Sequence, residues 1–156
     1  MQVLMNNKMI IELEILKKYA ESFGFKVNLN SKSSEMLTKR GTLNTPNKIN
    51  ITNTNSTHQC YLLLHELGHW ELMKDWDVYK QKYQFTAMGD EFACEKIYKY
   101  RRRIAYKVDI MREEFGAWEA GKKLATKLNI NIDELDYDRY SISYLFSYIK
   151  YLGNKK

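Results

Sequence analysis

The chain is organised around residues 57–70, which read THQCYLLLHELGHW. Within this stretch, His65, Glu66 and His69 form an H-E-x-x-H pattern. The unbroken apolar run before the pattern predicts a helix with Ser56 or Thr57 as its N-cap. Residues four apart in a helix share a face, so two imidazoles can bind one ion while Glu66 projects beside them. This is the arrangement of a zinc hydrolase, with two neutral histidine ligands, a glutamate general base and one open coordination position.

An ordinary buried helix with two hydrogen-bonded histidines is the alternative interpretation. Two features favour the metal. The chain has only three histidines, and two of them have this spacing around a glutamate. Gly68 lies inside the pattern, where glycine costs a helix about 1 kcal/mol relative to alanine. That cost is understandable if something approaches the backbone closely at this position.

Composition predicts one domain over residues 1–156, large enough to bury a core without disulfide bonds. The formal net charge of +6 permits contact with nucleic acid or an acidic partner without indicating it. The two cysteines, Cys60 and Cys94, form no metal-binding or disulfide pattern, so we expect reduced thiols. Neither a signal peptide nor a membrane span is visible. We therefore expect the protein to act in the cytoplasm where it is made, with no membrane partner.

The first half of the chain reads as a helix, three strands and the H-E-x-x-H helix. Helical periodicity covers residues 7–23, and Gly24 is placed to end that helix. Residues 25–30 and 48–52 alternate apolar and polar side chains, as half-buried strands do, and residues 34–43 hold a further candidate strand. In zinc peptidases of this layout an edge strand binds the substrate backbone. We expect Lys48–Thr52, or the strand before it, to do so; a purely structural strand is the alternative.

The second half is predicted to be almost entirely helical. Residues 90–114 form one long segment, residues 115–128 continue or restart it after Gly116, and residues 140–152 form a last, tyrosine-rich helix. Residues 129–136 are predicted to be a connection. Arg101, Arg102 and Arg103 are interpreted as a solvated helix face, with a phosphate contact as the minority interpretation.

A catalytic zinc of this type needs a third protein ligand. No histidine follows His69. Asp75 has the spacing of an extended motif, but Leu72 replaces the glycine that this motif requires. Neither cysteine has a recognisable ligand context. The remaining candidates are carboxylates of the later helices, namely Glu91, Glu95, Glu113, Glu114 and Glu119.

Helix geometry favours Glu114 among these candidates. Its neighbours three, four and seven positions away are apolar or small: Ile110, Met111, Ala117, Trp118 and Gly121. A carboxylate within such a stripe is buried, and a buried charge is tolerated when it is paired or bound to metal. Glu119 faces lysines and is expected to be solvated. Glu91, in a less apolar setting, is the second choice.

These residues resemble a known family. The His65–His69 motif, the Ser56-Thr57 lead-in and the Glu114-x-x-Ala117 pattern are similar to the ImmA/IrrE group of gluzincin-type zinc peptidases of phages and mobile elements. The stretch from Glu114 to Gly121 also resembles uncharacterised phage-encoded metallopeptidase-like proteins. The similarity covers roughly residues 45–125, and H-E-x-x-H is its specific part.

The resemblance implies an α+β, zincin-like fold: an N-terminal helix, a small three-stranded sheet and an active-site helix, then a helical half that delivers the glutamate ligand. It also implies proteolysis of a regulatory protein, such as a repressor, in the cytoplasm of a bacterial host. The interval between His69 and Glu114 is longer than expected for that group, so Glu91 stays open as the third ligand.

The predicted chemistry is peptide hydrolysis. His65, His69 and Glu114 bind Zn²⁺, and Glu66 takes the proton of the attacking water and passes it to the leaving amine. An oxyanion donor is also required, but no tyrosine stands out from the twelve. The main alternative is a non-proteolytic protein on a peptidase-like fold that binds a host factor or nucleic acid. A deformylase-like hydrolase is disfavoured because no cysteine ligand motif accompanies the helix.

Overall fold

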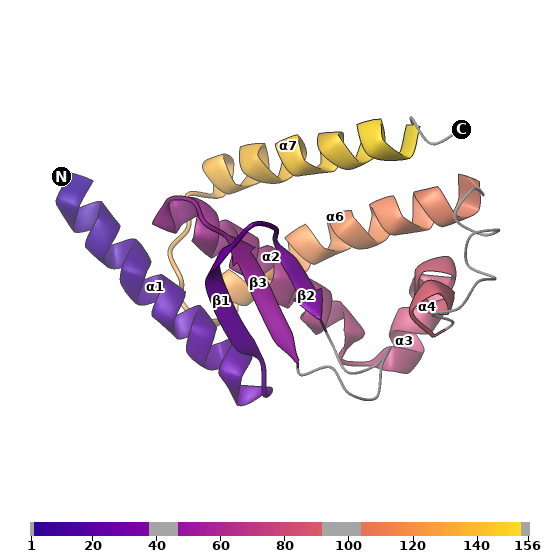
Figure 1. Cartoon of the computed structure of the whole chain (residues 1–156), viewed down its shortest axis with the longest axis horizontal. Helices are drawn as coiled ribbons and strands as arrows, with labels where there is room; N and C mark the ends of the chain where they lie inside the picture. The colour runs from indigo at the N-terminus through magenta and orange to yellow at the C-terminus, as the bar shows by residue number, and fades with distance from the viewer. Residues whose placement is uncertain (1, 38–46, 92–103, 154–156) are drawn as a thin grey trace.

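Six helices and a three-stranded mixed sheet make up the parts of the chain that the computed structural model describes, residues 2–37, 47–91 and 104–153 (Figure 1). For residues 2–8 and 88–91 only the backbone is described. The fold class is α+β and mostly helical, as expected. None of the described helices combines the length and apolar character that crossing a lipid bilayer requires.

The N-terminal helix, α1, spans Gln2–Ser22 and so begins before the predicted start at residue 7. It ends where the sequence indicates, because Gly24 adopts a positive φ of 79° that favours glycine. The chain then enters β1 (Lys26–Ser31). Leu13, Leu16 and Ala20 form the buried side of α1.

The sheet has the order β1-β3-β2, with β2 at Glu35–Leu37 and β3 at Lys48–Thr52. β3 pairs with β1 in parallel and with β2 in antiparallel orientation. The prediction that Lys48–Thr52 serves as an open edge is therefore wrong, since its ladder groups are used on both sides. The strand before it, β2, lies at an edge of the sheet.

The H-E-x-x-H pattern lies in helix α2, which spans Ser56–Met73 behind the sheet. Its N-cap is Asn55, whose side chain accepts a hydrogen bond of 2.9 Å from the His58 amide; neither predicted cap is correct. Every residue from Gln59 to Gly68 is buried. A helix apolar around most of its surface belongs at the centre of a fold, and α2 is that central element.

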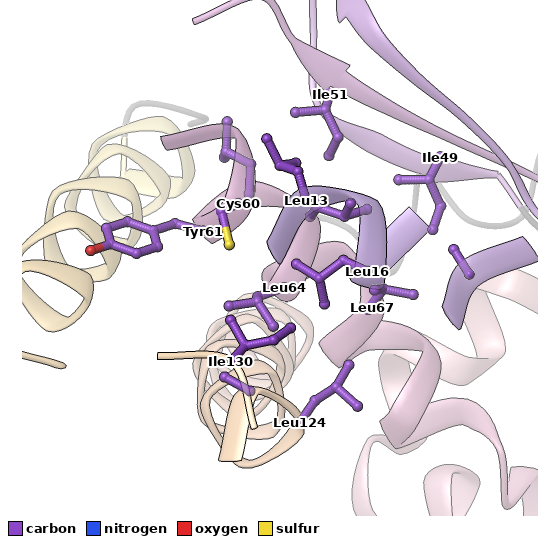
Figure 2. Close-up of a cluster of buried hydrophobic side chains, with 14 of the residues drawn as sticks. Leu13, Leu16, Ile49, Ile51, Cys60, Tyr61, Leu64, Leu67, Leu124 and Ile130 are labelled. Carbon is purple, nitrogen blue, oxygen red and sulfur yellow. The ribbon is translucent and has the colours of Figure 1, made fainter. Parts of the chain in front are cut away.

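The core surrounds α2 on several sides (Figure 2). α1 contributes Leu13 and Leu16, and β3 contributes Ile49 and Ile51. On the opposite side, the core includes side chains from the later part of the chain, among them Leu124 and Ile130. α2 is thus fixed by contacts from both halves of the sequence.

The second half begins with two short helices, α3 (Trp76–Lys82) and α4 (Gln84–Glu91). The long helix α6 spans Ile104–Lys127 and runs through Gly116 without a break. The predicted segment 90–114 lies partly outside the described residues. Cys94, Glu95 and the arginines at 101–103 lie in the part that is not described.

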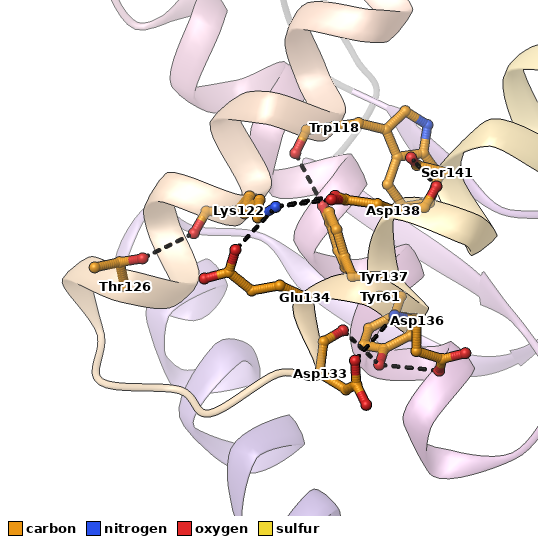
Figure 3. Close-up of polar contacts among 10 residues, drawn as sticks. All are labelled: Tyr61, Trp118, Lys122, Thr126, Asp133, Glu134, Asp136, Tyr137, Asp138 and Ser141. Atoms are coloured by element: carbon orange, nitrogen blue, oxygen red, sulfur yellow. Dashed lines mark hydrogen bonds and ion pairs between the residues drawn. The ribbon is translucent and has the colours of Figure 1, made fainter.

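The last helix, α7, spans Glu134–Gly153 and begins earlier than the predicted residue 140. Asp133 explains the early start, because its side chain accepts a hydrogen bond from the Asp136 amide, as an N-cap does. The first turns of α7 are attached to α6 by polar contacts (Figure 3). Lys122 forms ion pairs with Glu134 and Asp138, at 3.1 and 3.0 Å.

Candidate metal centre

The site depends on a close crossing of α2 and α6. A Cβ atom added to Gly68 would lie 1.9 Å from the Ala117 carbonyl oxygen, and one added to Gly121 would lie 2.5 Å from that of Leu64. Both distances are far below any real contact, so only glycine permits this backbone approach. The sequence-based expectation at Gly68 is thereby confirmed, and the approaching group is α6. The crossing places Glu114, one turn before Ala117, against the histidines of α2.

Three donor atoms converge at the crossing. The His65 Nε2 and His69 Nε2 atoms lie 3.2 Å apart, and the Glu114 Oε2 atom lies 3.3 Å from the first and 3.7 Å from the second. Donors about 2.0–2.2 Å from one tetrahedral ion are spaced by about 3.3 Å. Glu114 Oε2 is buried and has no hydrogen-bond partner, which is costly for a carboxylate unless a cation binds it. These residues therefore form a group that could hold a metal ion.

Different neighbours orient the two histidines. Glu113 accepts a hydrogen bond of 2.7 Å from the Nδ1 atom of His69, which turns Nε2 toward the site. A carboxylate in this position is the usual outer partner of a metal-binding imidazole. His65 Nδ1 is buried without a hydrogen bond; its ring instead stacks on Trp118, with centroids 4.3 Å apart.

Burial and neighbouring charges shift the pKa values of four side chains of the site. Burial lowers the pKa of His65. Burial also opposes the charge on His69, but Glu113 and Glu114 outweigh it and raise the His69 pKa to about 10. Burial raises the pKa of Glu66 to about 8. For Glu114, burial favours the neutral form, yet His65 and His69 hold its pKa below the usual value.

A cleft of about 260 Å³ opens over the three donor atoms. Glu66 lines it beside the histidines, as the motif predicts. The edge strand lines it too: Ser34, Glu35 and Met36 come from β2 and the turn before it. Thr86 of α4 lines it as well; Asp109 of α6 caps the start of α4 by accepting hydrogen bonds of 2.9 and 3.0 Å from the amides of Phe85 and Thr86.

Tyr148 is the site residue that could not be chosen from the sequence. It reaches the cleft from α7 and lines it together with Glu114. Burial and the charge of Glu114 raise the Tyr148 pKa, so the phenol stays protonated and can donate a hydrogen bond. The available signal was its place at the end of the series Tyr137, Tyr140 and Tyr144, spaced three or four residues apart on one helix face.

The other candidate ligands lie elsewhere or outside the described side chains. Glu119 is exposed, as expected, and Asp75 caps α3 by accepting from the Val78 amide. Cys60 is in the core, where burial raises its thiol pKa to about 12 and disfavours the thiolate that metals bind. The side chain of Glu91 is not among those described. The third histidine, His58, stacks on Tyr140 at the start of α2.

Comparison of the chain with protein families, curated proteins and solved structures gave no match in any of the three.

Proposed function

We propose that this chain is a zinc-dependent peptidase with a zincin-like arrangement. The observation that carries the proposal is the convergence of His65, His69 and Glu114 at ligand spacing, with Glu66 lining the same cleft. Two imidazoles and one carboxylate form a donor set that suits a catalytic zinc with one open position. When bound, zinc would polarise a peptide carbonyl and lower the pKa of a water molecule.

The residues of the chain then have separate roles. Glu66 takes a proton from the attacking water and delivers it to the departing amine nitrogen. The Tyr148 hydroxyl donates a hydrogen bond to the carbonyl oxygen as that atom gains negative charge. The open edge of β2 binds the peptide backbone in an extended conformation, which places the scissile bond over the donor atoms.

The acidic character of the cleft indicates the preferred substrate. Glu35, Glu66, Glu113 and Glu114 all line it, and none of the described residues that line it is lysine or arginine. Asn50 holds Glu35 at the wall through a hydrogen bond of 3.0 Å. A peptide with a basic side chain near the cleaved bond fits this charge. The family resemblance adds a protein substrate with a regulatory role, such as a repressor in a bacterial cytoplasm.

The test uses zinc-loaded protein and a mixture of random synthetic peptides, with cleavage read by mass spectrometry. Glu66→Gln keeps the shape and removes the base, so hydrolysis should fall by at least about 100-fold while zinc content stays unchanged. Glu119→Gln, an exposed change on α6, is the matched control and should leave hydrolysis intact. Full activity in Glu66→Gln would contradict the mechanism. A wild-type protein that binds zinc and cleaves nothing would favour the binding-protein alternative.

A further inference from the structure

Helix α7 has two unlike faces. Its inner face carries Tyr137, Tyr140 and Tyr144, whose rings all contact Trp118 of α6. Its outer face carries large apolar side chains that are more than half exposed: Leu135 at 61%, Ile142 at 63%, Phe146 at 56% and Ile149 at 53%. In Figure 1, no described element lies on the far side of α7 from α6. The described part of the chain therefore leaves this outer face uncovered.

The spacing of the outer residues is regular. Leu135, Ile142, Phe146 and Ile149 follow one another at intervals of seven, four and three residues. Apolar residues at alternating intervals of three and four form the seam along which two helices pack in a coiled coil. Arg139 occupies the one seam position between Leu135 and Ile142. Scattered surface apolar residues need no explanation, but a seam along most of a 20-residue helix predicts a partner helix.

Charge along α7 selects the partner. The first turn is acidic, with Asp136 and with Glu134, whose side chain stays 72% exposed beside Lys122, and the last turn is basic, with Lys150. Two copies of α7 in antiparallel orientation bring each acidic end against the basic end of the other copy. With the pair centred on residue 144, Ile142 faces Phe146 of the second copy and Arg139 faces its Ile149. Parallel pairing would place like charges together.

We propose that α7 pairs in antiparallel orientation with α7 of a second copy of this chain, through the seam of Leu135, Ile142, Phe146 and Ile149. The pairing is isologous, so a two-fold axis crosses the seam midway between Ile142 and Phe146 and closes the assembly as a dimer. The inner, tyrosine face stays on α6, and the proposal does not depend on the chemistry of the metal centre.

The first test is the mass in solution, measured by light scattering over micromolar to submillimolar protein. Wild type should have the mass of two chains, and Ile142→Asp that of one. Ile11→Asp is the matched control, because Ile11 is 62% exposed on α1, and this variant should remain a dimer. Circular dichroism should show all three folded, since both changes are at the surface. A monomeric wild type would overturn the proposal, as would a dimer of Ile142→Asp.

The second test addresses orientation, by oxidative cross-linking in a Cys94→Ser background. Ser143→Cys, next to the two-fold axis, should cross-link the two copies. Gly153→Cys, at the end of α7, should not, because antiparallel pairing places its copies at opposite ends. Equal cross-linking at both positions would show parallel pairing and overturn the orientation. A monomeric chain that binds anionic lipid vesicles in an Ile142-dependent way would assign the face to a membrane surface instead.

Discussion

Helix α6 is attached to α2 on one side and to α7 on the other, and the two attachments differ in kind. The α2–α6 crossing brings backbone against backbone, which Gly68 and Gly121 permit. The α6–α7 contact is made by aromatic rings and ion pairs, and the described part of the chain leaves the outer face of α7 uncovered. The first contact tolerates no added atom and sets the spacing of the proposed ligands. The second brings Tyr148 to the cleft from α7.

Adding one carbon atom where α2 crosses α6 should have the largest effect on stability and on zinc binding. In Gly68→Ala the new methyl group meets the Ala117 carbonyl, so the helices must separate. We expect the free energy of unfolding to fall by about 3 kcal/mol, despite alanine's better helix propensity, and zinc binding to be lost. Urea unfolding monitored by circular dichroism measures this change. Gly153→Ala is the control, since nothing lies within 4 Å of its Cβ position. Equal stability in both variants would mean that the close crossing is not real.

Substitutions of the two neighbouring glutamates of α6 should weaken zinc binding to different extents. Glu114→Gln removes a proposed ligand and should weaken zinc binding by well over 100-fold, more than the loss of an outer partner does. Glu113→Gln removes only the partner of His69 and should weaken binding by about 10- to 100-fold. Competitive titration against a chelator gives both constants.

Glu91→Gln is the control for this series and should bind zinc like wild type. If Glu91→Gln is the variant that fails to bind, the third ligand comes from α4 and the assignment of Glu114 is wrong.

In α7, Tyr148→Phe should lower kcat by about 100-fold and change zinc affinity much less. The substitution removes the hydroxyl that donates a hydrogen bond to the carbonyl oxygen of the substrate. Tyr144→Phe lies on the same face of α7 against Trp118 and should keep its activity. Steady-state kinetics on one cleaved peptide compares the two variants. Identical rates in Tyr148→Phe and wild type would exclude the tyrosine from the reaction.

The smallest effect concerns the stability of metal-free protein between pH 6.5 and 8. The His69 pKa rises from 6.5 to about 10 on folding, and that of Glu66 from 4.5 to about 8. In this window the folded state therefore binds more protons than the unfolded state, and stability falls as pH rises. Zinc should reverse the trend, because neutral histidines bind it better at higher pH. Thermal unfolding with and without zinc tests this; a metal-free protein that becomes more stable toward pH 8 would contradict the assigned shifts.

Features that depend on local sequence could be predicted, whereas features that depend on contacts between distant segments could not. The α2 helix was predictable because its apolar run is local and unbroken, and β3 because its apolar and polar side chains alternate. Glu114 was identified as buried from its own helix stripe. The N-cap at Asn55 and the early start of α7 at Asp133 were missed, since several polar residues in each connection could serve as caps. The central position of β3 was missed because strand order depends on pairing between distant segments. Tyr148 could not be chosen for a related reason: its role depends on how α7 lies across α6.

The most direct test of the central claim is zinc-edge X-ray absorption of the wild-type protein at neutral pH, combined with elemental analysis. We predict one zinc per chain, with two imidazole ligands, oxygen in the remaining positions and no sulfur. The same spectrum is expected after both cysteines are changed to serine. A sulfur neighbour, or a protein that keeps no stoichiometric zinc, would contradict the site formed by His65, His69 and Glu114.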